Sequence, residues 1–338
     1  MKAFILGRYG KKQQLRLGDM PEPVPGPDDV LVEVAAAGLN PIDSKIRDGA
    51  FNPALPYKTP LVLGHDLAGT VISVGANVRR FKVGDAVYAR PRDGRIGAFA
   101  ERITVNESDL ALKPGNISMA EAASIPLIGL TVWQVLIERA QIKPGQKVLI
   151  HAGSGGVGTF AIQLAKHLGA TVATTASAAN AAMVKELGAD VVIDHRSQKF
   201  EEELSGYDVV FHTLDATTLE KSLRVLKPDG KLISISGAPD PAFARSQGLN
   251  VVLRLVLRLL SAGIRRKAKL AGVEYSFLFM HADGGQLERI TKLIVDGTIR
   301  PVVDCAFPFE QLNDALAYID TGRAKGKVVV TRSADGKF

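Results

Sequence analysis

The chain has 338 residues, of which 46% are hydrophobic and 23% charged, and its formal net charge is +7. This length exceeds one ordinary core, so we expect two domains of a soluble globular protein, and the composition excludes a disordered chain. The positive charge favours an anionic ligand or surface, but no dense Lys/Arg tract interleaved with aromatic residues indicates nucleic acid.

Cysteine usage and the N-terminal segment bear on the cellular compartment. Cys305 is the single cysteine, so an internal disulfide and a multi-cysteine zinc site are excluded, and we expect a buried side chain in a reducing compartment. The apolar run in "MKAFILGRYG" is broken by Gly7 and Arg8 and predicts a first strand rather than a signal peptide. No uncharged apolar run reaches 18 residues, so we expect no spanning helix and a cytoplasmic location.

The first part of the chain is rich in short Val, Ile and Leu runs separated by Gly, Pro and Asp. β-branched residues alternate at Val30, Val32 and Val34, and "LVLGHDLAGTVISVGANVRRFKVGDAVYAR" continues as strands punctuated by glycine. We therefore predict a β-rich domain, a barrel or a sandwich with few helices, over residues 1–122.

From about Ala122 the pattern changes to strands that alternate with helices. The expected strands are 148–150, 171–174, 191–195, 207–214 and 230–236, with 273–280 as a candidate last strand, and the expected helices are 159–168, 178–189 and 219–226. This alternation predicts βαβ units and a parallel sheet over residues 123–282. A helix at 286–295, the segment 299–311, a helix at 312–319 and a strand at 326–332 follow, and we expect residues 283–338 to return to the first domain.

A glycine cluster, "HAGSGGVG", lies between the first of these strands and its helix. Gly153, Gly155 and Gly158 form a GxGxxG pattern, and its strand–loop–helix–strand setting is the one that dinucleotide binding requires. The glycines permit a tight turn, close approach of a pyrophosphate and close packing of helix on strand, while the helix N-terminus offers free N–H groups. The predicted phosphate loop consists of Gly153, Ser154, Gly155, Gly156, Val157 and Gly158.

The end of the second strand of this unit favours NADPH over NADH. NAD sites usually carry an acid there for the ribose 2′-hydroxyl, whereas this chain has hydroxyl and amide side chains, with Ser177 and Asn180 as the candidates. A basic partner for a 2′-phosphate is expected from His195 or Arg196 at the end of the next strand.

Motifs spread over nearly the whole chain carry a family resemblance. They include "AAAGLNPIDSKIRDG", "PLVLGHDLAGTVISVG", "AASIPLIGLTVWQVL", "KPGQKVLIHAGSGGVG", "LKPDGKLISISG" and "GRAKGKVVV". In this order they resemble the medium-chain dehydrogenase/reductase superfamily, within it the zinc-free quinone oxidoreductases, and most closely the reticulon-interacting and enone-type reductases. The resemblance implies an α/β protein with a GroES-like β-rich catalytic domain, a Rossmann domain with a doubly wound parallel sheet, an active site in the interdomain cleft, and a homodimer.

The resemblance also implies roles for individual residues. Asn40 and Asp43 of "NPID" would lie at the nicotinamide ribose and the cleft floor, Thr131 near the nicotinamide, and Lys327 near the cleft. Asp43 could instead cap a helix.

Two further residues are candidates for contact with the acceptor. Tyr57 could donate a hydrogen bond or a proton to a substrate carbonyl, or simply pack as a loop residue, and His65 is either a hydrogen-bonding residue of the cleft or a packed one.

The pattern departs from the zinc-dependent alcohol dehydrogenases of that superfamily. Their metal-binding cysteine is replaced by Asn40, and only His65 of "GHD" survives as a ligand, so we expect no metal. Without a Lewis acid, hydride transfer to quinones or α,β-unsaturated carbonyls is favoured over alcohol oxidation. An enoyl-thioester reductase and a non-catalytic NADPH-binding sensor or interaction protein stay open as alternatives.

Residues 249–270 form a basic amphipathic pattern. Arg254, Arg258 and Arg265 recur at helical spacing among valines and leucines. Such a helix can lie weakly in an anionic membrane interface, or it can pack on the Rossmann domain with its arginines in solvent.

Overall fold

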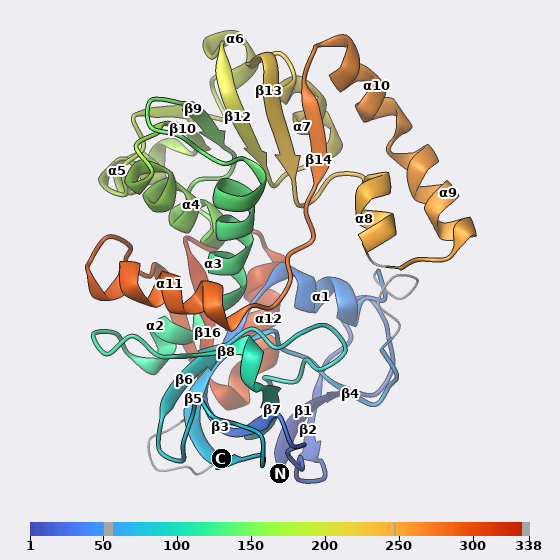
Figure 1. Cartoon of the computed structure of the whole chain (residues 1–338), viewed down its shortest axis with the longest axis vertical. Helices are drawn as coiled ribbons and strands as arrows, with labels where there is room; N and C mark the ends of the chain where they lie inside the picture. Colours follow the sequence, from blue (N-terminus) through green and yellow to red (C-terminus); the bar gives the residue numbers. More distant parts are fainter. Residues whose placement is uncertain (51–56, 247, 333–338) are drawn as a thin grey trace. The chain divides into compact units, whose positions relative to one another are not determined.

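The computed structural model describes residues 1–50, 57–246 and 248–332 and divides into two compact units (Figure 1). The first unit comprises Met1–Leu130 and His281–Phe338, and the second comprises Thr131–Met280. The sequence predicts boundaries after residues 122 and 282, whereas the division lies after residues 130 and 280. The first division falls inside helix α3 (Pro126–Trp133).

The first unit is built on two sheets. A seven-stranded sheet has the order β15-β16-β3-β5-β6-β8, with β7 also paired to β3, and a three-stranded sheet has the order β2-β1-β4. Its strands are β1 (Lys2–Leu6), β2 (Arg16–Asp19), β3 (Asp29–Leu39), β4 (Leu61–Val62), β5 (Asp66–Val74), β6 (Ala86–Ala89), β7 (Arg102–Asn106), β8 (Leu110–Leu112), β15 (Val303–Pro308) and β16 (Lys327–Thr331). The C-terminal segment returns to this unit because β16 pairs antiparallel with β3.

The helices of the first unit are short, apart from two near the C-terminus. They are α1 (Pro41–Arg47), α2 (Met119–Ala123), the start of α3, α11 (Gly284–Val295) and α12 (Leu312–Asp320), with 3₁₀ turns at Glu107–Asp109 and Phe309–Gln311. These elements bear out the predicted β-rich domain with few helices.

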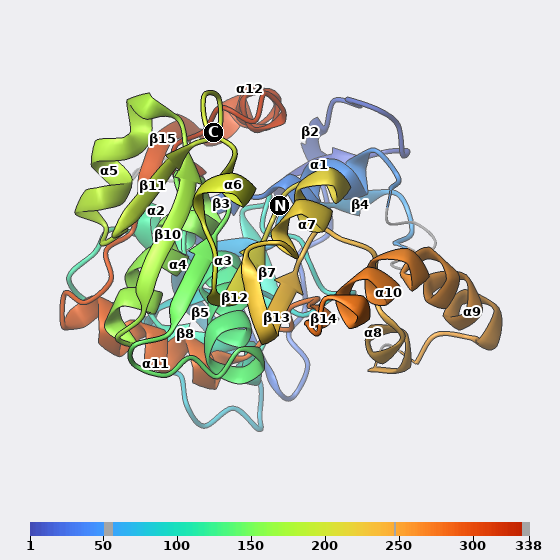
Figure 2. The same cartoon turned by 90° about the horizontal axis from the view of Figure 1, so that it is seen from above.

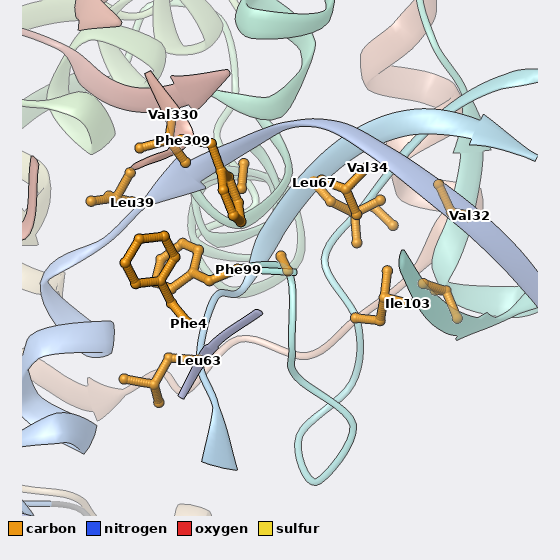
Figure 3. Packing of buried hydrophobic residues seen from close by; sticks show 14 of the residues in the cluster. Phe4, Val32, Val34, Leu39, Leu63, Leu67, Phe99, Ile103, Phe309 and Val330 are labelled. Carbon is orange, nitrogen blue, oxygen red and sulfur yellow. The ribbon is translucent and has the colours of Figure 1, made fainter. Parts of the chain in front are cut away.

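The core of the first unit lies where the two sheets meet (Figure 3). Phe4 of the small sheet packs with Val32, Val34 and Leu67 of the large one in a single cluster of buried residues. The ring of Phe4 meets that of Phe309 edge-on at 5.4 Å, so the returning chain segment contributes to the same core. Burial of this apolar surface holds both sheets and the C-terminal segment together.

The second unit is an all-parallel sheet with the strand order β11-β10-β9-β12-β13-β14. Its strands are β9 (Lys147–Ile150), β10 (Thr171–Ala176), β11 (Val191–Asp194), β12 (Tyr207–His212), β13 (Leu226–Ser234) and β14 (Glu274–Phe277). Counted along the chain this is the order 3-2-1-4-5-6 of the doubly wound dinucleotide-binding fold, which confirms the predicted Rossmann domain. In such a sheet the ligand crevice lies at the carboxyl ends of the strands where the order reverses, here between β9 and β12.

Helices connect these strands, as Figures 1 and 2 show. They are α4 (Gly156–His167), α5 (Ala181–Glu186), α6 (Phe200–Glu203), α7 (Ala216–Ser222), α8 (Pro241–Ser246), α9 (Val251–Leu260) and α10 (Ala262–Leu270), with a π-helical turn at Gln134–Arg139 and a 3₁₀ turn at Ala178–Asn180. In the described part of the chain, no helix is both long enough and apolar enough to cross a membrane.

Two expected helices differ from the structure. The helix expected at 219–226 is α7, which begins earlier because the Asp215 carboxylate caps it by accepting from the Thr218 N–H, and Leu226 already belongs to β13. The single helix expected through 249–270 is two helices that meet at Ser261, whose hydroxyl donates to the Leu257 carbonyl.

Two buried histidines stand at the point where the strand order of the second unit reverses. His151 follows β9 and His212 ends β12, both are 0% exposed, and their rings lie 5.8 Å apart. His151 Nε2 lies 2.9 Å from the Ser222 hydroxyl, and His212 Nδ1 lies 2.9 Å from the Ser234 hydroxyl. Burial lowers the pKa of His151 to about 3 and that of His212 to about 4, so both rings are neutral at pH 7.

This pair predicts a loss of stability in mild acid. As the pH falls below about 6.5, the unfolded chain protonates both histidines while the folded chain does not, so the free energy of unfolding falls by about 2 kcal/mol per histidine by pH 5. Urea unfolding between pH 7.5 and 5 measures this. His212→Asn should remove about half of the pH dependence that this pair contributes. An unaltered slope in that variant would contradict the assignment.

Candidate active site and dinucleotide-binding loop

A buried ammonium group joins three strands of the first unit. The Nζ atom of Lys327 donates to the Leu39 carbonyl at 3.0 Å, to Asn40 Oδ1 at 2.6 Å and to Asp66 Oδ2 at 3.0 Å. Lys327 is 4% exposed and Asp66 is 0% exposed. All three N–H donors of the ammonium are therefore satisfied, and the carboxylate has its counter-charge inside the protein.

The strand register brings these groups together. Lys327 begins β16, whose next residue, Val328, lies opposite Leu39 at the end of β3. Asp66 begins β5 and lies opposite Gly38 of β3. A cation and an anion far apart in the sequence thus meet at the end of β3, from the strands on either side of it.

Asp66 also anchors the helix that follows α2. Its Oδ2 atom accepts from Asn40 Nδ2 at 2.9 Å, and its Oδ1 atom accepts from the Leu127 N–H at 2.7 Å. Leu127 lies in the first turn of α3, where a carboxylate is favourable because the N–H groups are free and the helix dipole is positive.

Asp43 connects the start of α1 to His65. Its Oδ2 atom accepts from the Asn40 N–H at 2.8 Å, and its Oδ1 atom lies 2.6 Å from His65 Nδ1. Asp43 therefore caps α1, as the sequence suggests, and it also contacts His65. Because a carboxylate only accepts, His65 Nδ1 carries the hydrogen, while the buried His65 Nε2 has no hydrogen-bond partner among the described residues.

The donor set at this place does not fit a zinc ion. The oxygens of Asn40 and Asp66 that face one another already hold the ammonium of Lys327, and a second cation there would be repelled. Zinc in proteins needs about three nitrogen, sulfur or carboxylate ligands, and the described residues contain no group of three His, Cys, Asp or Glu side chains placed to bind a metal.

The glycine loop of the second unit has the packing of a phosphate-binding turn. A Cβ atom on Gly153 would stand 3.0 Å from the Thr174 Cβ, and one on Gly158 would stand 2.6 Å from the Gly153 Cα, so both positions require glycine. Gly155, in contrast, has only the Ala152 carbonyl at 3.4 Å and adopts an ordinary φ of −82°. The chain's own packing therefore leaves room for a side chain at Gly155, and a glycine there keeps this face open to a ligand.

Helix α4 presents free N–H groups beside this loop. Gly155 is its N-cap and supplies no side chain to satisfy them, and the first amide bonded within the helix is that of Thr159, to the Gly155 carbonyl. The amides of Gly156, Val157 and Gly158 consequently have no intrahelical acceptor. Ser154 to Val157 are half-buried and not fully enclosed, so an anion can reach them.

The four candidates for a 2′-phosphate lie at adjoining strand ends. Ser177 follows β10, and His195 and Arg196 follow β11, whose Asp194 pairs with Ala176. Asn180 ends the 3₁₀ turn after Ser177, and its N–H donates to the Ser177 carbonyl at 2.9 Å. His195 and Arg196 are exposed, and Ser177 and Asn180 are half-buried, so these side chains are open to a ligand.

Two neighbouring hydroxyls and a carboxylate are engaged elsewhere. Thr174 Oγ1 donates to the Ile150 carbonyl at 2.7 Å, and Thr175 Oγ1 accepts from the Ala152 N–H at 3.0 Å. The acid of the β11 turn, Asp194, accepts from the Arg196 N–H and the Ser197 hydroxyl, which hold its pKa below the usual range.

Other predicted residues lie outside these two groups. Tyr57 is half-buried against the first core, where its hydroxyl accepts from the Gly94 N–H at 3.3 Å and its pKa is raised by burial. Thr131 is buried in α3. Cys305, expected to be buried, is only half-buried, and desolvation raises the pKa of its thiol.

Sequence reasoning missed Asp66 as a member of the site. A carboxylate in the apolar run "GHDLAG" and an ammonium in "GKVVV" both lie in strands that are otherwise buried, and a buried charge needs a partner. That argument predicts a buried partner for each of these two charges.

Both units match known families. Residues 26–115 match the family described as the alcohol dehydrogenase GroES-like domain, and residues 187–330 match the family described as zinc-binding dehydrogenase. The chain is 36% identical to the NADPH-dependent alkenal/one oxidoreductase of Arabidopsis thaliana chloroplasts, an alignment that covers 98% of this chain and 79% of that one. The chain belongs to the medium-chain dehydrogenase/reductase superfamily.

Within the superfamily its relatives include the groups that the sequence motifs indicate. The mitochondrial NAD(P)H oxidoreductase RTN4IP1 of Danio rerio is 32% identical over 100% of this chain and 92% of that one. The solved structure of the quinone oxidoreductase from Coxiella burnetii aligns with a TM-score of 0.85 and 30% identity over 98% of this chain and 99% of that one. This member of the superfamily holds an internal ammonium among Asn40 and Asp66.

The Lys327–Asp66 pair predicts a strong and coupled effect on stability. Lys327→Met leaves the Asp66 carboxylate buried without a cation, so the free energy of unfolding should fall by about 3–5 kcal/mol in urea titrations. Lys327→Met combined with Asp66→Asn should cost less than Lys327→Met alone, because the second change removes the orphaned charge. Simple addition of the two single losses would show that the pair is not coupled.

Proposed function

We propose that the protein is a zinc-independent, NADPH-dependent reductase that transfers hydride to quinones or α,β-unsaturated carbonyl compounds. The observation that carries this proposal is the ammonium of Lys327 among the oxygens of Asn40 and Asp66 in the first unit, in a chain whose second unit has the dinucleotide-binding fold. Alcohol oxidation needs an alkoxide stabilised by a Lewis acid, whereas an electron-poor acceptor takes hydride without one. The names of the alkenal/one and quinone oxidoreductase relatives support this class of acceptor.

The coenzyme assignment rests on the second unit. The residues present fit a dinucleotide: the α4 amides and the open face of Gly155 suit a pyrophosphate, and the acid-free end of β10 beside His195 and Arg196 suits a 2′-phosphate. The Arabidopsis relative is named as NADPH-dependent. When bound, NADPH supplies the hydride.

We assign a group of buried polar residues to positioning the reactants. Asn40, Asp43, His65, Asp66 and Lys327 are buried and hydrogen-bonded to one another, so we assign them to fixing the end of β3 and the start of α1. Such a preorganised polar wall costs no rearrangement during the reaction. We propose that this rigid support holds Asn40 at the nicotinamide ribose and Lys327 near the cleft.

Tyr57 is our candidate for contact with the acceptor carbonyl. Its hydroxyl accepts one hydrogen bond from the Gly94 N–H, which leaves its own O–H free to donate in the described structure. Burial raises its pKa, so the phenol keeps its proton at neutral pH. His65, by contrast, is 0% exposed, and we assign it to positioning through Asp43.

Steady-state oxidation of NADPH with a panel of quinones, enones, enoyl thioesters and simple ketones tests the function. We expect turnover with quinones or enones and none with simple ketones. Gly155→Ala tests the coenzyme site. The added methyl group meets no atom of the chain closer than 3.4 Å, so the variant should fold normally. It should bind NADPH at least about ten-fold more weakly, because the methyl group would occupy the proposed pyrophosphate position.

The other outcomes separate the alternatives. Exclusive turnover of enoyl thioesters would replace the proposed acceptor class with acyl thioesters. Tight NADPH binding without turnover of any acceptor would contradict the enzyme proposal and favour a sensor or interaction protein.

Coenzyme preference is expected to reside in Arg196. Arg196→Ala should weaken NADPH binding about ten-fold and leave NADH binding unchanged, because only the 2′-phosphate can use the guanidinium. Titration of Trp133 fluorescence with each coenzyme measures both constants. Lys199→Ala is the control, since Lys199 is an exposed cation of the same turn that pairs with Glu202. Equal losses for NADH and NADPH would contradict the assignment.

We also propose a homodimer in a reducing compartment, the cytoplasm. The dimer is supported by the outer edge of β14, which ends the sheet of the second unit and pairs with no other described strand, and sedimentation velocity tests it. The compartment is supported by the single unpaired thiol of Cys305.

A further inference from the structure

Helix α9 turns an apolar stripe away from the rest of its unit. Val251, Val252, Leu255, Leu259 and Leu260 are between 55% and 78% exposed, and no residue of the helix is buried. At 100° per residue these five side chains occupy one continuous side of the helix. This exposed stripe lies on the side of α9 that does not pack against the unit.

The opposite side of α9 holds the helix in place. Leu253 and Leu257 are the half-buried residues among its leucines, and Ser261 at its end is 0% exposed. Helix α10 then packs through Ile264 and Ala268 into the core of the second unit. In Figures 1 and 2, α9 lies beyond α10 on the outer side of that unit. The apolar stripe of α9 is therefore exposed on a helix that α10 connects to the core of the second unit.

The charge around the stripe has one sign. Residues 241–273 contain seven Arg and Lys and no Asp or Glu, in a chain whose net charge is +7. Arg254 and Arg258 are exposed and flank the stripe, and α10 adds exposed Arg265 and Arg266. A surface that is apolar in the middle and basic at the margin complements the interface of an anionic lipid bilayer.

We propose that α9 lies in the headgroup region of an anionic membrane, with the stripe Val251, Val252, Leu255, Leu259 and Leu260 facing the acyl chains and the flanking arginines facing lipid phosphates. A ten-residue helix is about 15 Å long, so this contact is peripheral, weak and reversible. The inference is independent of the proposed reaction. A membrane-bound position would give the enzyme direct access to acceptors dissolved in the bilayer.

A second copy of the chain fits this face less well. An isologous contact through α9 would bring the same basic margin of each copy together, with no acid from residues 241–273 to offset it. Lipid headgroups bring the opposite charge.

Co-sedimentation of the full chain with vesicles tests the proposal. We expect binding to phosphatidylcholine vesicles that contain about 30% phosphatidylglycerol, binding to pure phosphatidylcholine at least about ten-fold weaker, and weakening in high salt. The variant Leu255→Asp/Leu259→Asp should lower the bound fraction about ten-fold or more. Because both leucines are over half exposed, its thermal unfolding should match the wild type.

The matched control is Val24→Asp/Val83→Asp, which changes two exposed valines of the first unit. This variant should bind vesicles like the wild type. Equal loss in both variants, or no binding to anionic vesicles at millimolar lipid, would overturn the proposal. Conversion of a dimer to a monomer by the α9 variant alone, without vesicles, would also overturn it and assign the stripe to self-association.

Discussion

The first unit depends on one buried ion pair. Lys327 and Asp66 come from strands 261 residues apart in the sequence, and their contact, shared with Asn40 and the Leu39 carbonyl, fixes where β3 ends and α1 begins. Removing either charge leaves the other desolvated, so the pair constrains the geometry more than it contributes to net stability. The oxygens of Asn40 and Asp66 already hold the ammonium of Lys327, so a second cation at this place would be repelled, which agrees with the proposed acceptors that need no Lewis acid.

The second unit contributes a separate constraint, because its loop is shaped for a ligand. Gly153 and Gly158 are required by the chain's own packing, but Gly155 is not. Close approach of a pyrophosphate explains why a glycine with room for a side chain stands at a helix N-terminus whose amides have no intrahelical acceptor. Together the units describe a protein that binds a dinucleotide at one site and keeps a rigid, internally neutralised polar wall at another.

The sequence predicts the parts that depend on local patterns. Strand alternation, the glycine loop and the family motifs give both folds and the order of the elements. Local periodicity does not predict contacts between distant residues, such as that of Lys327 with Asp66, which require an argument about buried charge. The exposure of α9 could not be predicted, since valines and leucines at helical spacing suit a core and a membrane equally. The division into two helices at Ser261 is likewise not revealed by the helical spacing.

The proposed reaction is direct hydride transfer from NADPH to an electron-poor double bond. The most direct measurement uses NADPH with deuterium at both C4 positions and an enone in ordinary water, followed by mass spectrometry and NMR of the product. Direct transfer should leave one deuterium on the β-carbon and an ordinary hydrogen on the α-carbon, because the hydride comes from the coenzyme and the proton from the protein or water. A reduced product without deuterium on the β-carbon would contradict it.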